Sequence, residues 1–241
     1  MTAQLTVGSL CSGIGGLDLG LERAGMRVIW QSEVDPYACR VLAKHWPDVP
    51  NLGDVTTIDW STVERPDVIC GGYPCQPFSY AGARRGEHDH RHLWPYMLRA
   101  LRYLRPRYAL LENVTGHLSL GFGRVLGDLA EIGFDAEWSV VSACAMGAPH
   151  ARERVLVVAY PCAIGRERRR SHGPAHGSPD RQTRQSEGRN PNTAWLAVPG
   201  ATVRGVANGV PHRVDRLRGL GNAVVPQVAE HVGHLIARAA R

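Results

Sequence analysis

The sequence has 241 residues, a formal net charge of +6 and a pI near 9.2, and 44% of its residues are hydrophobic. This length allows one large α/β domain, or one domain that carries a small second module. No apolar run approaches the roughly 18 residues needed to cross a bilayer, and the first five residues lack the features of a signal peptide, so we expect neither a membrane protein nor a conventionally exported one.

Short apolar runs alternate with amphipathic segments through most of the chain. We predict strands at 5–10, 26–32, 67–70, 108–111, 138–141 and 155–158, and helices at 17–24, 36–45, 93–104 and 125–132. A last helix is expected near the end, with one face marked by Val224, Val228, Val232 and Leu235. Strands separated by helices at this rhythm indicate βαβ units, so we predict a doubly wound α/β domain with a mostly parallel sheet.

The pattern breaks between residues 163 and 193, which contain seven arginines against three acidic residues. Because this segment has almost no large apolar side chains, it cannot bury enough surface to offset its ordering entropy. We predict a mobile basic loop, which is either a contact arm for nucleic acid or a solvated insertion. The basic residues are arginines except for Lys44, which fits a nucleic-acid partner or codon bias in a GC-rich genome.

The first candidate site is a glycine-dense turn between the first strand and the first helix. It contains Gly13, Gly15 and Gly16, and Glu33 ends the next strand. Such a turn lets the backbone approach a nucleoside, and a carboxylate at that strand end commonly binds ribose hydroxyls. The third glycine of the dinucleotide fingerprint is missing, so the turn indicates either a nucleoside cofactor or an ordinary tight turn.

Cys75 lies between Pro74 and Pro77, just beyond the end of a buried strand. Open α/β sheets place their ligands at that edge, and the two prolines fix the backbone around the thiol. We predict that Cys75 is a nucleophile, since positive surroundings there would favour its thiolate. The other five cysteines are expected to be small packed thiols, and the sequence has no C-x-x-C pair that would indicate a zinc ribbon: Cys11, Cys39, Cys70, Cys144 and Cys162.

Charged side chains are expected at the same edge as Cys75. Glu112 ends the next strand, either as a proton donor with a raised pKa or as a paired structural acid. Arg152 and Arg154 lie on one side of a later strand, where they hold a base edge or a phosphate, or form ordinary salt bridges. Histidines alternate between residues 88 and 92, but no other ligands accompany them, so we expect no metal site.

Taken in chain order, these motifs resemble the DNA (cytosine-5) methyltransferase family over nearly the whole chain. The resemblance implies a Rossmann-like S-adenosylmethionine-dependent methyltransferase fold with a small irregular target-recognition insert. Residues 1–160 and 216–241 would form the catalytic domain. Residues 161–215 would form a short target-recognition region that includes the basic mobile loop, and this region is short for the family.

The resemblance also assigns catalytic roles. Residues 74–76 are similar to the family's nucleophile motif, and residues 112–114 to its acid motif. Residues 150–154 are similar to the later Q-x-R-x-R motif, with histidine in place of the glutamine. The implied catalytic residues are a nucleophile for cytosine C6, an acid at N3, and two arginines at O2: Cys75, Glu112, Arg154 and Arg152.

S-adenosylmethionine is the cofactor that the resemblance implies. Residues 12–16 resemble the family's first motif, and residues 221–226 its last motif, which returns to the cofactor pocket. Cys11 replaces the phenylalanine that usually packs on adenine, Glu33 corresponds to the ribose-binding acid, and Asp54 to the residue at the adenine amino group. The implied cofactor-binding residues are Cys11, Gly13, Ile14, Gly15, Gly16, Glu33, Asp54, Val55, Pro74 and Asn222.

We therefore expect a DNA cytosine-5 methyltransferase of a phage or a bacterial modification system, acting on a cytosine flipped out of double-stranded DNA. The alternatives are a transfer-RNA cytosine-5 methyltransferase and a catalytically silent nucleic-acid-binding relative, and a Rossmann oxidoreductase would leave residues 74–76 unexplained. Residues 76–92 would form a closing lid over the base. We expect a monomer in the cytoplasm of a bacterial cell or a phage-infected host, with room for a partner that supplies target recognition.

Overall fold

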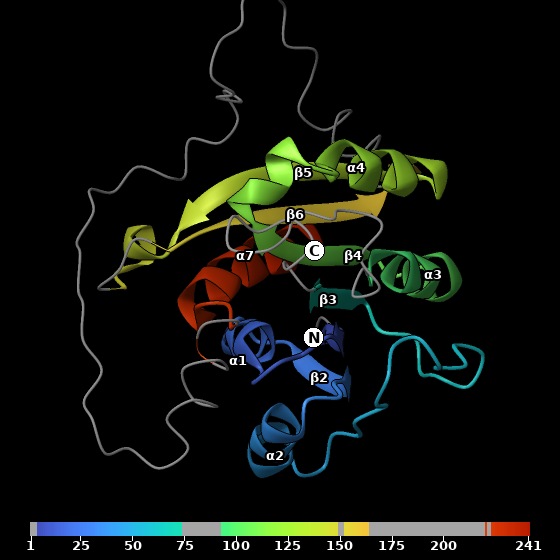
Figure 1. Cartoon of the computed structure of the whole chain (residues 1–241), viewed down its shortest axis with the longest axis vertical. Coiled ribbons are helices and arrows are strands. Elements are labelled where there is room, and N and C mark those ends of the chain that lie inside the picture. The colour runs from blue at the N-terminus through green and yellow to red at the C-terminus, as the bar shows by residue number, and fades with distance from the viewer. Residues whose placement is uncertain (1–3, 74–92, 149–151, 164–219, 221–222) are drawn as a thin grey trace, which may run out of the picture.

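The computed structural model describes residues 4–73, 93–148, 152–163, 220 and 223–241 (Figure 1). Six strands form one sheet in the order β2-β1-β3-β4-β6-β5. Strands β2, β1, β3 and β4 are parallel to one another, and β6 runs antiparallel to both of its neighbours. The predicted α/β fold with a mostly parallel sheet is confirmed. The strands are β1 (Thr6–Leu10), β2 (Arg27–Ser32), β3 (Val68–Gly72), β4 (Tyr108–Val114), β5 (Phe134–Ser142) and β6 (Glu153–Pro161).

Helices cover both faces of the sheet. Helices α1 and α7 pack on one face of the sheet, and α3 and α4 pack on the other (Figure 1). On each face, the two helices and the sheet share one buried apolar cluster. The helices are α1 (Gly16–Arg23), α2 (Pro36–His45), α3 (Trp94–Leu104), α4 (Phe122–Glu131) and α7 (Pro226–Ala239), with short 3-10 helices η2 (Thr115–Ser119) and η3 (Ala143–Met146).

The elements expected in the described residues occur close to their predicted positions. Strands β5 and β6 are longer than the apolar runs that indicated them, because half-exposed residues extend their pairing over nine positions. The expected buried face of the last helix is wrong at one position. Ile236 is buried there, whereas Leu235 is only half-buried, because buried positions along α7 recur every four residues from Val228.

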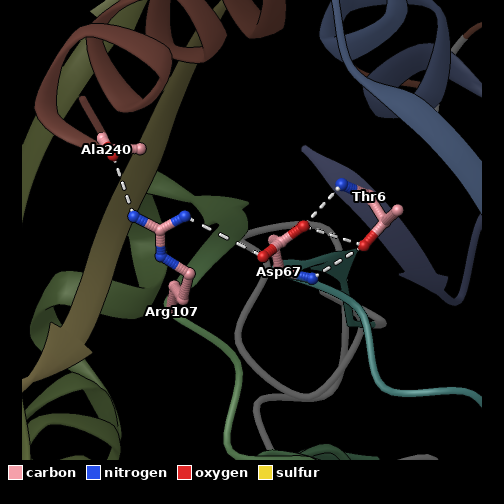
Figure 2. A network of polar contacts seen from close by, with 4 residues as sticks. All are labelled: Thr6, Asp67, Arg107 and Ala240. Carbon is pink, nitrogen blue, oxygen red and sulfur yellow. Dashed lines mark hydrogen bonds and ion pairs between the residues drawn. The ribbon is translucent and has the colours of Figure 1, made fainter. Parts of the chain in front are cut away.

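The edge at which the parallel strands begin is held by a polar network (Figure 2). Asp67 Oδ2 accepts hydrogen bonds from Thr6 N at 2.9 Å and from Thr6 Oγ1 at 3.0 Å. Arg107 Nη1 lies 3.9 Å from Asp67 Oδ1, and Arg107 Nη2 donates to the Ala240 carbonyl at 2.9 Å. The network connects the starts of β1, β3 and β4 to the end of α7. The candidate site is at the opposite edge, where the parallel strands end.

Within the described residues, no helix has both the length and the apolar character required to span a membrane. The basic segment and nearly all of the expected target-recognition region lie outside the described residues. The division of the chain into a catalytic and a recognition part therefore stays a prediction.

Candidate functional site

The candidate site lies at the edge where the parallel strands end. The chain passes from β2, on one side of β1, to β3 on the other side, so the sheet has its topological switch point at β1. Ligands of open α/β sheets bind outside the carboxyl ends of the strands at such a point. The glycine turn follows β1, Glu33 follows β2, and Glu112 lies near the end of β4.

Glu112 forms a buried ion pair with an arginine of the neighbouring strand. Its Oε1 lies 2.8 Å from Arg154 Nε, and the two side chains are 8% and 21% exposed. The pairing of β4 with β6 explains this contact, because Arg154 is opposite Val114, two residues along the same face from Glu112. The geometry holds the carboxyl group in one orientation.

The pKa of Glu112 is raised by burial, against the opposing charges of Arg154 and then Arg152. The effect of desolvation on the pKa is larger than that of the two guanidinium groups. At a given pH, a larger fraction of Glu112 is therefore protonated than of an exposed glutamate. A carboxyl group that is oriented by arginine and biased toward protonation is suited to donating a proton or a hydrogen bond.

Gly72 provides the space for this carboxyl group. It is opposite Glu112 in the parallel pairing of β3 with β4. A Cβ atom at Gly72 would stand only 2.7 Å from Glu112 Oε2. Pro74 and Cys75 follow Gly72 by two and three residues in the sequence, so the chain continues toward the predicted nucleophile from a residue that is opposite the acid.

Arg152 lies on the same side of the sheet edge as Arg154. Its charge lowers the pKa of Glu112, and its Nη1 donates to the Leu220 carbonyl at 3.4 Å. Both arginines therefore lie near the acid at this edge. Which of them contacts a substrate stays a prediction.

The glycine turn requires glycine for two reasons, namely left-handed backbone conformations and close contact with a neighbouring backbone. Gly13 has φ +56° and Gly15 has φ +80°, values that favour glycine. Gly16 meets a different constraint, because its Cβ would lie 2.4 Å from the carbonyl oxygen of Val224. The turn thereby packs directly against the backbone that precedes α7.

Glu33 holds this turn in place through backbone hydrogen bonds. Its Oε2 accepts from Gly13 N at 2.7 Å, and its Oε1 accepts from Val34 N and Asp35 N, both at 2.8 Å. A carboxylate offers about four lone-pair positions. Among the described residues, one acceptor position of Glu33 therefore stays available for a further donor, such as a ribose hydroxyl.

Cys11 precedes the turn in a left-handed conformation, with φ +49°. Burial, and then the charges of Glu33 and Asp54, raise the pKa of its thiol to about 12. The thiol stays protonated at neutral pH, as expected for a packed cysteine rather than a nucleophile. Asp54 itself is exposed and accepts a hydrogen bond from Thr56 N at 2.8 Å, while Val55 beside it is buried.

A cavity of about 1260 Å³ connects the glycine turn with the arginines. This volume is sufficient for a cofactor-sized molecule. Its lining includes residues of the turn, of the first part of β6 with the residue before it, and of the segment before α7, among them Ile14, Gly15, Gly16, Arg152, Arg154 and Val224.

Several predicted site residues lie outside the described residues, namely Pro74, Cys75, Asn222 and the segment 76–92. Their roles stay predictions. In the described part of the chain, no group of three or more His, Cys, Asp or Glu side chains is placed to hold a metal ion.

Two buried polar groupings were not predicted from the sequence. Asp18 accepts hydrogen bonds from Ser9 Oγ at 2.9 Å and from Gln31 Nε2 at 2.8 Å, directly beneath the glycine turn. Tyr73 and His117 form a hydrogen bond between the ends of β3 and β4. One weak signal for the second grouping exists in the sequence, since Tyr73 directly precedes the proline of the nucleophile motif.

Residues 5–186 match the family model described as C-5 cytosine-specific DNA methylase. The type II methyltransferase M.BsuFI of Bacillus subtilis is 35% identical over 167 residues, which cover 67% of this chain and 41% of that protein. The type II methyltransferase M.NgoMIV of Neisseria gonorrhoeae is 36% identical over 161 residues, 65% of this chain and 52% of that protein. The chain thus spans about half of the length of these relatives.

The solved structure of Entamoeba histolytica methyltransferase EhMeth has the same fold, with a TM-score of 0.57. Its sequence is 23% identical, and the match covers 66% of this chain and 53% of that one.

Proposed function

Because the chain belongs to the C-5 cytosine-specific DNA methylase family, we propose that it transfers a methyl group from S-adenosylmethionine to C5 of a cytosine in double-stranded DNA. The observation that carries this proposal is the buried pair of Glu112 and Arg154, with 2.8 Å between Oε1 and Nε. The pair lies beside Gly72, three residues before the predicted nucleophile Cys75.

The glycine turn supports the use of a nucleoside cofactor, and Ile14, Gly15 and Gly16 of this turn line the cavity, whereas Glu33 and Asp54 do not. Gly13, Gly15 and Gly16 allow the close backbone approach that such a ligand needs, and Glu33 keeps one acceptor position for its ribose. We assign the rest of the cofactor set as the family motifs imply: Cys11, Ile14, Asp54, Val55, Pro74 and Asn222. When bound, S-adenosylmethionine supplies an electrophilic methyl group on its sulfonium.

The chain's own residues would activate the cytosine. The thiolate of Cys75 forms a bond to C6, and the electron density displaced toward N3 is met by a proton or hydrogen bond from Glu112. Arg154, with Arg152, holds the base at O2. After methylation, a base removes the proton from C5, the electron pair of the bond between sulfur and C6 returns to sulfur as the thiolate, and N3 returns its proton to Glu112.

The target cytosine must leave the base stack, because C6 is out of reach inside a duplex. An extruded base needs a concave site with donors on its wall, and Arg152 and Arg154 line a cavity of this kind, whose described lining does not include Glu112. The type II relatives support a role in DNA modification. We propose a monomer that acts on double-stranded DNA, with target recognition supplied by residues 161–215 or by a partner.

The proposed reaction is tested by trapping the covalent adduct. The full chain is incubated with S-adenosylmethionine and duplex DNA that contains 5-fluorocytosine, whose fluorine blocks the final loss from C5. We expect a denaturation-resistant complex that Cys75→Ser does not form. Bisulfite sequencing of DNA from an expressing host would then identify the target sequence.

Two outcomes would overturn the proposal. Methyl transfer to transfer RNA without transfer to duplex DNA would favour the transfer-RNA enzyme. Binding of S-adenosylmethionine or DNA without any adduct or methyl transfer would favour a catalytically silent relative.

A further inference from the structure

Tyr73 lies at the point where the chain leaves β3 for the segment that contains Cys75. Its side chain is 4% exposed. Its ring packs on Trp94, with 5.6 Å between centroids, and edge-on against His117, with 5.5 Å between centroids. Trp94 begins α3, where the chain returns from the same segment, so both ends of that segment are held in one aromatic cluster.

The tyrosine hydroxyl and the histidine ring form a hydrogen bond with a defined direction. Tyr73 Oη lies 2.6 Å from His117 Nε2, and His117 Nδ1 lies 2.9 Å from the Leu120 carbonyl oxygen. A carbonyl oxygen can only accept, so Nδ1 carries a hydrogen, and in the neutral imidazole Nε2 then accepts from the tyrosine. Burial raises the pKa of Tyr73, against a side-chain hydrogen bond with Asn113 that lowers it, and the net direction keeps its hydroxyl protonated as the donor.

This hydrogen bond joins the two strand ends that supply the proposed reaction. His117 lies in η2, which directly follows β4 and its acid Glu112. Tyr73 directly follows Gly72, which is opposite Glu112 in the sheet. Trp94 is fixed in turn, because its Nε1 donates to Asp128 Oδ2 of α4 at 2.8 Å.

We propose that Tyr73 and His117 are a positioning pair, whose hydrogen bond fixes the end of β3, from which the chain continues toward Cys75, relative to the end of β4 that carries Glu112. In this proposal neither residue takes part in the bond changes. Misplacement of reacting groups by about 1 Å can lower a rate on the order of 100-fold, so a single hydrogen bond behind the site can control the reaction. The kinetic test of this inference rests on the proposed function, because it measures the proposed reaction.

The test removes the hydroxyl alone. In Tyr73→Phe, we expect the single-turnover rate of adduct formation with 5-fluorocytosine DNA to fall about 10-fold or more. The dissociation constant for S-adenosylmethionine and the KM for DNA should stay within about twofold of the wild type, since the pair touches neither ligand. His117→Gln, which keeps an acceptor, should retain more activity than His117→Leu.

Tyr160→Phe is the matched control. It removes another tyrosine hydroxyl, which donates to Glu137 Oε1 at 2.5 Å between β6 and β5. A purely structural effect would lower the melting temperature in both variants and leave both rates unchanged. That result would overturn the positioning role.

A second measurement does not depend on catalysis. The rate at which iodoacetamide alkylates Cys75, followed by mass spectrometry, should differ from the wild type in Tyr73→Phe and stay unchanged in Tyr160→Phe. If the wild-type chain forms no adduct and transfers no methyl group, the proposed function fails, but this alkylation rate still decides the positioning inference. An unchanged rate in Tyr73→Phe would contradict it.

Discussion

Glu112 is a buried acid whose pKa reflects two opposing influences. Burial raises that pKa, while the charges of Arg154 and Arg152 lower it, and the net direction is upward. A neutral carboxyl group donates to N3 of a cytosine, whereas its carboxylate form would repel the density that develops there. The role that we propose for Glu112 therefore depends on a proton, and this dependence can be tested directly.

Replacing Glu112 with glutamine keeps the size of the side chain and removes its transferable proton. In Glu112→Gln we expect the single-turnover rate of methyl transfer to fall by roughly 100-fold to 10,000-fold, the usual contribution of general acid catalysis. The wild-type rate should also decline as the pH rises through the Glu112 pKa. The exposed Glu131→Gln serves as the control, and a Glu112→Gln rate close to that of the wild type would contradict the acid role.

Asp18 makes a second prediction at the residue scale, because it is fully buried and its carboxyl group is held by the neutral side chains of Ser9 and Gln31. Burial raises its pKa from 3.8 to about 6, against the hydrogen bonds from Gln31 and Ser9. The folded state therefore binds this proton more tightly than the unfolded state. Its contribution to stability is fully present below about pH 4 and is lost as the pH rises toward about 6.

The pH dependence of unfolding checks this sign. Asp18→Asn removes the titration, and Ser9 can turn its hydroxyl to accept from the new amide. Between pH 4 and pH 7, the free energy of unfolding of the wild type should fall relative to that of Asp18→Asn by up to roughly 3 kcal/mol. Urea unfolding at several pH values measures the difference, with the exposed Asp48→Asn as control. Parallel pH profiles for the wild type and Asp18→Asn would disprove it.

At the scale of elements, α1 and α7 pack through glycines. A Cβ at Gly20 would lie 2.4 Å from Ala229 Cβ and 2.4 Å from the Pro226 carbonyl oxygen, and one at Gly233 would lie 2.7 Å from Ala24 Cβ. These residues let the helix backbones approach closely. The packing matters for the site, because α1 begins at the glycine turn and α7 follows the segment that packs on Gly16.

Two glycine substitutions separate this packing from helix propensity. Gly20→Ala should destabilise the protein by about 1–3 kcal/mol, because α7 must move to accommodate the methyl group. Gly127→Ala, in the middle of α4 where a Cβ would meet nothing within 4 Å, should instead stabilise by up to about 1 kcal/mol. Thermal and urea unfolding give both values. Equal effects of the two substitutions would show that the two helices are not tightly packed.

Hydrophobic periodicity was sufficient to predict the helices and strands of the described residues. Motif spacing was sufficient to place Glu112 and Glu33 at strand ends. The antiparallel direction of β6 was not predicted, because an apolar run such as 155–158 has the same pattern in either direction. Asp18 was missed because a polar residue in a helix normally indicates an exposed face. The hydrogen bond between Tyr73 and His117 joins positions 44 apart in sequence, and no local pattern encodes such a pair.

At the scale of the whole molecule, the distribution of charge separates the two edges of the sheet. The Asp67 network closes the edge where the strands begin, while Arg152 and Arg154 line the cavity at the opposite edge. The first residues of β6 lie at this same cavity edge, whereas the last residues of β6, which precede the basic segment, lie toward the opposite edge because β6 runs antiparallel to β4. The net charge of +6 therefore includes arginines at the edge where we propose that DNA binds.

If the basic segment contacts phosphates, its arginines will control how DNA affinity depends on salt. The logarithm of the binding constant falls with the logarithm of the salt concentration, by about 0.9 for each phosphate neutralised. Replacing Arg168, Arg169 and Arg170 with glutamine should therefore reduce this slope by roughly 0.9 for each phosphate that is no longer neutralised, and should weaken binding to all duplex sequences alike. Fluorescence anisotropy with duplex DNA at several salt concentrations measures the slope.

Three exposed arginines near the opposite edge provide the control: Arg27, Arg65 and Arg102. A slope that changes equally in both triple variants would mean that net charge alone acts on DNA, and an unchanged slope in the first would identify the segment as a solvated insertion.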